Sequence, residues 1–176
     1  MTGDGAGILI VSTRDPDGEP VCEMTWGPLQ WYAPVADVRE AALDLMTCAA
    51  YAEMMKQMIT EAGLPPAVVE QFTTHLLRDR EKRYFGARTV MELMPAGAVK
   101  RTSGQRLAVV LLKRGTMNEM LYAEHARTEA LAWLAVAEAT ESDQLVSEAL
   151  RATGIADQED QERLFGYLRQ LRSKDQ

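Results

Sequence analysis

Residues 107–112 read Leu-Ala-Val-Val-Leu-Leu, and this aliphatic run decides the fold. Its length and its paired valines favour a buried strand, but Ser103 and Gly115 would equally suit the caps of a helix. Periodicity alone does not separate the two structures in so short a run. Val99 lies beyond the turn-forming residues 102–104, so the stretch is predicted to form the second strand of a hairpin.

A similar pattern stands near the start of the chain. Residues 8–11 form a short run rich in β-branched residues, residues 15–18 read Asp-Pro-Asp-Gly, and residues 21–26 resume a strand-like stretch. Aspartate, proline and glycine favour a tight turn, so a first hairpin is predicted here. Gly27-Pro28 is expected to end it.

The rest of the chain predicts helices. Asp37 with Glu40, and Thr116 with Glu119, have the spacing of a capping box and predict two helix starts. The expected helices cover Asp37 to about Gly63, Pro66 to Lys82, Thr116 to about Ala139, Asp143 to Ala152, and a segment after Asp157. Residues 87–94 fit a strand or a helix, with a slight preference for a strand.

These elements predict an α+β fold in which two hairpins form a small antiparallel sheet packed against several helices. The whole chain, 1–176, is expected to be one domain with a flexible tail at 1–7. Shifting the chain by 88 residues aligns identical residues, which are Val21/Val109, Gly27/Gly115, Arg39/Arg127, Ala42/Ala130, Leu43/Leu131, Ala49/Ala137 and Glu53/Glu141. Chance explains them nearly as well as an internal duplication with half-repeats at 8–86 and 97–172.

Composition places the protein among ordinary folded, soluble chains, with 47% hydrophobic and 26% charged residues. No run approaches the roughly 20 apolar residues of a membrane span, and no basic start of a secretory signal is present, so a cytoplasmic location is expected. The 14 arginines against 5 lysines suggest a GC-rich bacterial genome. Two cysteines are too few for a disulfide framework.

Positive charge is crowded into the middle third. Residues 64–115 carry ten bases against four acids, whereas the two flanking segments carry net charges of −7 and −6. The candidate anion or nucleic-acid contacts are Arg78, Arg80, Lys82, Arg83, Lys100, Arg101 and Arg106. Alternatively, acidic flanks of the same fold or of a second subunit neutralise these bases, which the overall charge of −7 favours.

A partner-binding surface is the second candidate site. Trp31 and Tyr32 crowd a short connection, and Met54 and Met58 lie near the end of the first helix. Aromatic clusters on loops and methionine-rich faces suit adaptable binding surfaces. Packing in the core is the alternative for all four residues.

No catalytic or metal site is predicted. His125 and Glu129 lie one helical turn apart, but a catalytic zinc needs a third protein ligand, and none stands at a defined spacing. His75 and the two cysteines lack the sequence context of a nucleophile and its base. No phosphate-binding glycine pattern occurs, and no cofactor is predicted.

The sequence therefore predicts a non-enzymatic binding or regulatory protein that acts through protein–protein contacts, with a homodimer and an unidentified protein partner expected. A nucleic-acid-associated accessory protein using the basic middle segment is the alternative. A small enzyme using His125, Glu129 or a cysteine is the remaining hypothesis.

Overall fold

The computed structural model describes residues 7–81, 92–100, 106–154 and 158–172, with the backbone alone in 77–81, 92–100, 158, 161–162 and 169. The elements in chain order are β1 (Leu9–Arg14), β2 (Pro20–Trp26), β3 (Leu29–Ala33), α1 (Val35–Thr60), α2 (Pro66–Glu81), β4 (Glu92–Lys100), β5 (Arg106–Arg114), β6 (Met117–Tyr122), α3 (Ala123–Thr153) and α4 (Gln158–Arg172). Among the described helices, none is long and apolar enough to cross a membrane.

The α+β class and the antiparallel hairpins are confirmed, but the strands form two sheets instead of one. The N-terminal sheet has the order β1-β2-β3, and the C-terminal sheet has the order β4-β5-β6. The run at 107–112 is a strand, as predicted, and it lies at the centre of its sheet. The predicted turn at 102–104 and the tail at 1–6 lie outside the described residues.

Each hairpin gains a third strand that the sequence reading missed. Gly27 and Gly115 adopt the left-handed φ values of 55° and 58° at the tight turns before β3 and β6. Thr116 therefore lies in a turn, and the helix start predicted there is wrong. Strand β6 follows instead, with Met117 and Leu121 packed against the core and Met120 exposed, the alternation of a half-buried strand.

The helices are confirmed with changed bounds. Helix α1 starts two residues before the predicted Asp37, after Pro34, which makes no side-chain cap hydrogen bond. Helix α3 is continuous from Ala123 to Thr153, so the break predicted between Ala139 and Asp143 is absent. Gly154 ends it with a left-handed φ of 61°.

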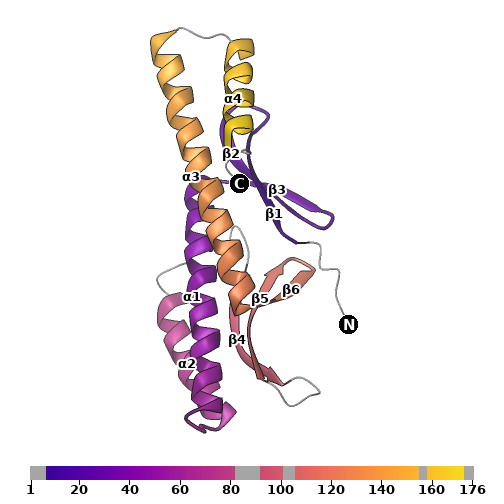
Figure 1. The fold of residues 1–176 in the computed structure, drawn as a ribbon, viewed down its shortest axis with the longest axis vertical. Coiled ribbons are helices and arrows are strands. Elements are labelled where there is room, and N and C mark those ends of the chain that lie inside the picture. The colour runs from indigo at the N-terminus through magenta and orange to yellow at the C-terminus, as the bar shows by residue number, and fades with distance from the viewer. Residues whose placement is uncertain (1–6, 82–91, 101–105, 155–157, 173–176) are drawn as a thin grey trace.

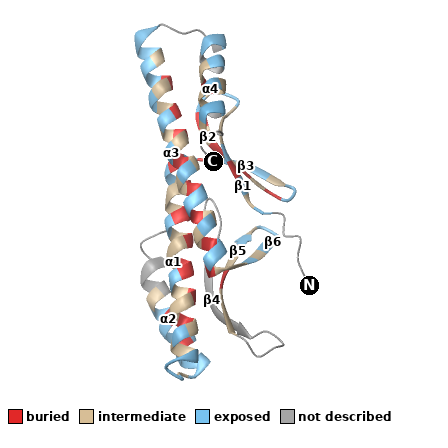
Figure 2. Ribbon diagram, in the orientation of Figure 1, coloured by how far each residue is buried: buried red, intermediate tan, exposed pale blue. Residues whose placement is uncertain are grey.

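Helices α1 and α3 run side by side in opposite directions, and both sheets lie on one side of this pair (Figure 1). The buried residues of the two helices lie along their contact and beneath the sheets (Figure 2). The N-terminal sheet packs mainly on α3, and the C-terminal sheet packs mainly on α1. Each sheet is thus covered by the long helix from the other half of the chain.

The two halves share the order of three strands and two helices, and the offset of 88 residues aligns β2 with β5 and α1 with α3. Several pairs of residues aligned by this offset have the same environment. Four aligned pairs on the long helices are completely buried, and they are Val38/Ala126, Ala42/Ala130, Leu45/Trp133 and Ala49/Ala137. The aligned leucines Leu43 and Leu131 are both exposed.

Two ion pairs between α1 and α3 are also equivalent. Arg39 donates to Glu141 across 2.5 Å and to Glu138 across 2.9 Å. Arg127 donates to both carboxylate oxygens of Glu53, at 2.8 and 2.5 Å. Because Arg39 aligns with Arg127 and Glu53 with Glu141, the helix pair has approximate two-fold symmetry.

Candidate partner-binding surface

The outer face of the N-terminal sheet, turned away from the helices, exposes apolar side chains. Along β1 and β2, alternate residues such as Ile10, Cys22 and Met24 are buried against the core. The residues between them face outward, and Leu9 is 61% and Val11 38% exposed. These two side chains lie on β1, one of the two edge strands of the sheet.

The middle of the same outer face is polar. Val11 is paired with Glu23 of β2, and Glu23 is paired with Tyr32 of β3. Gln30 donates a hydrogen bond to the Glu23 carboxylate. The exposed ring of Tyr32 is therefore separated from Leu9 and Val11 by a charged residue, so the apolar part of the face is confined to the edge.

Strands β1 and β4 occupy corresponding edge positions in the two sheets, but they differ in sequence. Strand β4 contains Pro95, opposite Val110, and its register shifts between Ala96 and Val99. The residue of β1 in the position of Pro95 is Ser12, opposite Cys22, and the register of β1 is regular from Leu9 to Arg14. Proline and bulges block further strand pairing, so β4 has a protected edge and β1 does not.

The four predicted partner residues do not form one surface. Tyr32 is exposed on the outer face of β3, whereas Trp31 points to the opposite face, where it packs partly buried against the core. The guanidinium carbon of Arg114 lies 4.0 Å from the centre of the Trp31 ring. Met54 and Met58 are half-buried on the C-terminal half of α1, away from β3.

The predicted basic residues are distributed over several elements. Arg78 and Arg80 belong to α2, while Lys82, Arg83 and Arg101 lie outside the described residues. Lys100 ends β4 and is directly opposite Arg106, the first residue of β5. Two basic residues therefore occupy opposite positions in the register at the end of this strand pair where residues 101–105 connect β4 to β5.

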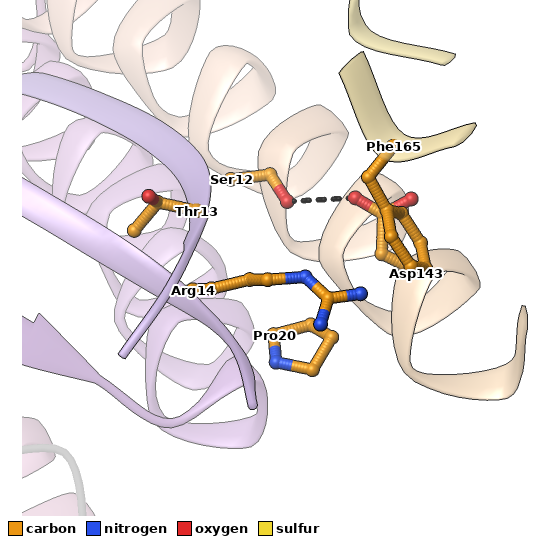
Figure 3. Close-up of a pocket in the computed structure, with 6 residues that line it drawn as sticks. All are labelled: Ser12, Thr13, Arg14, Pro20, Asp143 and Phe165. Atoms are coloured by element: carbon orange, nitrogen blue, oxygen red, sulfur yellow. Dashed lines mark hydrogen bonds between the residues drawn. The ribbon is translucent and has the colours of Figure 1, made fainter. Parts of the chain in front are cut away.

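A polar cluster joins α4 to β1 and α3 (Figure 3). Asp143 is buried and accepts hydrogen bonds from Ser12, at 3.0 Å, and from two nitrogens of Arg172, at 3.0 and 2.8 Å. The Arg14 guanidinium lies over the Phe165 ring at 4.1 Å and donates to the Ser147 hydroxyl. The sequence reading missed this cluster because its members are up to 160 residues apart, from Ser12 to Arg172.

The cavity within this polar cluster is too small for an organic ligand. It measures about 20 Å³ and lies between Arg14, Pro20, Asp143 and Phe165. This volume accommodates a single water molecule. The cluster therefore acts in attaching α4, and we assign it no ligand.

His125 and Glu129 are on α3, as predicted, and Glu119 of β6 contributes a second carboxylate nearby. Burial raises the pKa of Glu129, and the Glu119 charge raises it further. Two neighbours lower it, the Trp133 indole nitrogen and His125. The indole nitrogen lies near the carboxylate but does not meet the geometry of a hydrogen bond. No group of three or more potential metal-binding side chains occurs within the described part of the chain.

Both cysteines are free thiols buried in the core. Burial raises the pKa of Cys22, whose Sγ atom lies 3.4 Å from the Thr140 hydroxyl. A raised pKa keeps the thiol protonated and therefore a poor nucleophile. His75 lies on the exposed side of α2, far in sequence from either thiol.

The exposed apolar pair Leu9 and Val11 was not among the predicted site residues. Residues 8–11 are all aliphatic, so their sequence carries no alternation to tell the outer face from the inner one. No protein-family model, no curated protein and no solved structure matches this chain.

Proposed function

We propose that this protein is a non-enzymatic binding protein that acts through protein–protein contacts as a homodimer, with the N-terminal sheet as its contact region. The observation that carries the proposal is the exposure of Leu9 and Val11 on an unprotected edge strand. Exposed apolar side chains next to unpaired strand backbone are typical of protein contact sites.

The surroundings of His125 and Glu129 support a binding role over catalysis. The raised pKa of Glu129 is explained by its burial beside Trp133 and needs no catalytic role. Neither cysteine thiol reaches the surface. Both thiols are thus closed off from an outside substrate.

Sedimentation equilibrium of the full chain tests the proposal. We expect a dimer at micromolar concentration, and Leu9→Lys should weaken it at least tenfold, because a charge replaces an apolar contact. Leu131→Lys is the matched control, since Leu131 is equally exposed but lies on α3. A monomer at all concentrations up to about 100 µM, which corresponds to a contact free energy weaker than about −5.5 kcal/mol, would contradict the homodimer.

A nucleic-acid-associated role is the second candidate, and the Lys100–Arg106 register favours it. Like charges directly opposite each other on neighbouring strands destabilise a sheet. A phosphate bound between them would remove that repulsion, so the pair suits a polyanion. Arg101, which follows Lys100 in sequence, adds a third base to this segment.

Fluorescence anisotropy with a labelled oligonucleotide at 50 and 200 mM salt tests this second role. Phosphate contacts predict an affinity that falls steeply with salt, and replacing Lys100, Arg101 and Arg106 by alanine should reduce both the affinity and its salt dependence. Binding unaltered by the triple substitution, or no binding at low salt, rules the role out.

A further inference from the structure

We infer that the second copy of the chain pairs edge to edge with β1, antiparallel and across a two-fold axis, so that the two N-terminal sheets join into one six-stranded sheet. This inference rests on the proposed homodimer and assigns its interface. The order across the dimer would be β3-β2-β1 followed by the partner's β1-β2-β3.

The sequence of the edge strand is the first argument. β1 reads Leu-Ile-Val-Ser-Thr-Arg, without lysine, proline or bulge, which are the features that keep sheet edges from pairing. Its counterpart β4 has both a proline and a register shift. Within one chain, the edge at β4 is therefore protected from further strand pairing, whereas the corresponding edge at β1 is open to it.

The position of Glu23 is the second argument, because it excludes packing of the two sheets face to face. Glu23 lies at the centre of the outer face, between Val11 and Tyr32. A face-to-face dimer would bury two Glu23 carboxylates without a cationic partner, which is strongly unfavourable. Edge pairing leaves Glu23 in solvent and covers only the strand that carries Leu9 and Val11.

Side-chain alternation then restricts the register to those with the two-fold axis centred on a residue, and we place that axis at Val11. Residues directly opposite each other in a sheet point to the same face, so an outward residue of β1 must oppose an outward residue of the partner. Centring the axis on Val11 places the two valines opposite each other and places Leu9 opposite the partner's Thr13. Centring it on Ser12 would use a side chain that already binds Asp143 and would leave Val11 opposite threonine.

Cysteine cross-linking tests this register in the full chain. In Val11→Cys the two new thiols would lie on Cα atoms about 4.5–5.5 Å apart, within disulfide range, so mild oxidation should give mostly covalent dimer. The native cysteines Cys22 and Cys48 are buried and do not compete. Val11 and Leu9, the two positions changed to cysteine, lie on the exposed face, so these substitutions leave the core unaltered.

Leu9→Cys is the matched control. Leu9 is more exposed than Val11, but in this register the two copies of Leu9 are four residues out of line, about 13 Å along the strand. It should give little covalent dimer alone, and an efficient heterodimer when mixed with Thr13→Cys. Equal cross-linking of Val11→Cys and Leu9→Cys, which random collision would give, overturns the inference.

The outcomes separate this inference from the proposed function. A wild-type dimer in sedimentation with no Val11→Cys cross-link overturns the edge interface but leaves the homodimer standing. A wild-type monomer contradicts the homodimer itself. Amide exchange at Leu9–Arg14 should also slow as protein concentration rises. If exchange slows only when an extended peptide is added, the edge binds a different partner, and pairing with a second copy is overturned.

Discussion

At the scale of single residues, two glutamates on the long helices respond to pH in opposite directions. The hydrogen bonds from Arg127 lower the pKa of Glu53 below the ordinary glutamate value of 4.5. Burial raises the pKa of Glu129 above the same value. Glu53 therefore stabilises the fold when ionised, whereas ionised Glu129 destabilises it.

Replacing Glu129 by glutamine should stabilise the protein at pH 7. The stability linked to a raised pKa is fully present below the unfolded value of 4.5 and is lost as pH rises through the folded value. Glutamine removes the ionisation while keeping the shape, so we expect a gain of roughly 1 kcal/mol or less at pH 7, or a few degrees in Tm. Thermal unfolding at pH 7 and pH 4 measures it, and a gain of the same size at both values would refute the explanation.

Replacing Glu53 by glutamine should have the opposite effect. The stability linked to a lowered pKa is present above 4.5 and is lost as pH falls through the folded value. Both partners are 40% exposed, so the expected loss at pH 7 is only about 0.5–1 kcal/mol. Urea unfolding should show this loss at pH 7 and a smaller one at acidic pH; a loss that grows on acidification would contradict it.

At the scale of elements, α4 depends on a few contacts made from its middle and its C-terminal end. Its C-terminal Arg172 binds Asp143 of α3, and its Phe165 lies under the Arg14 guanidinium. Asp143→Ala would leave Arg172 and Ser12 without their shared acceptor. We expect a loss of about 1.5–3 kcal/mol, the range for hydrogen bonds to charged groups, and faster amide exchange in residues 158–172.

The control for α4 is an ion pair within the same helix, which does not connect α4 to another element. Arg163 and Glu159 are 73% and 72% exposed, so Glu159→Gln should leave amide exchange in α4 nearly unchanged. If both variants accelerate exchange equally, the Asp143 contact does not attach the helix.

Local sequence patterns predicted most of these elements because the information lies within a few residues. The turn at Asp15–Gly18 and the proline at the start of α2 specify backbone conformation directly. The Thr116–Glu119 pattern failed because a capping box needs only two residue types, and Gly115 had already turned the chain into β6. Leu29–Ala33 was missed because its apolar residues also fit a loop that packs on the core.

The candidate site was less predictable, because exposure depends on distant segments. Leu9 and Ile10 are both large and aliphatic, yet only the packing of α3 beneath the sheet makes one exposed and the other buried. The offset of 88 residues identified Arg39 as aligned with Arg127, and Glu53 as aligned with Glu141. Their pairing across two antiparallel helices was not visible in the sequence.

At the scale of the whole molecule, the packing of each sheet on the long helix of the other half predicts a single cooperative unfolding step. Each sheet packs mainly on the long helix of the other half and the two helices pack on each other, so loss of either helix exposes one sheet and the facing side of the remaining helix. Tryptophan fluorescence and far-UV circular dichroism should therefore give coincident urea transitions. Two separated transitions would mean that the halves fold independently.

A pair of leucines on α1 gives the mutational test of that cooperativity. Leu45 is completely buried, so Leu45→Ala should cost about 2–5 kcal/mol and should shift both signals by the same amount. Leu43 is 51% exposed on the same helix, and Leu43→Ala should change stability by no more than about 0.5 kcal/mol. A Leu45→Ala shift seen by only one signal would argue against a shared core.

The covering of each sheet by a helix from the other half also has a consequence during synthesis on the ribosome. The inner face of the N-terminal sheet, with Cys22, Met24 and Trp26, is complete when residue 33 has been made, but its cover, α3, ends at residue 153. At about 5–20 residues per second, the ribosome adds the intervening chain in roughly 6–24 s. The nascent chain carries uncovered apolar surface throughout that interval, so this small protein is an expected client of the chaperones that bind emerging polypeptides.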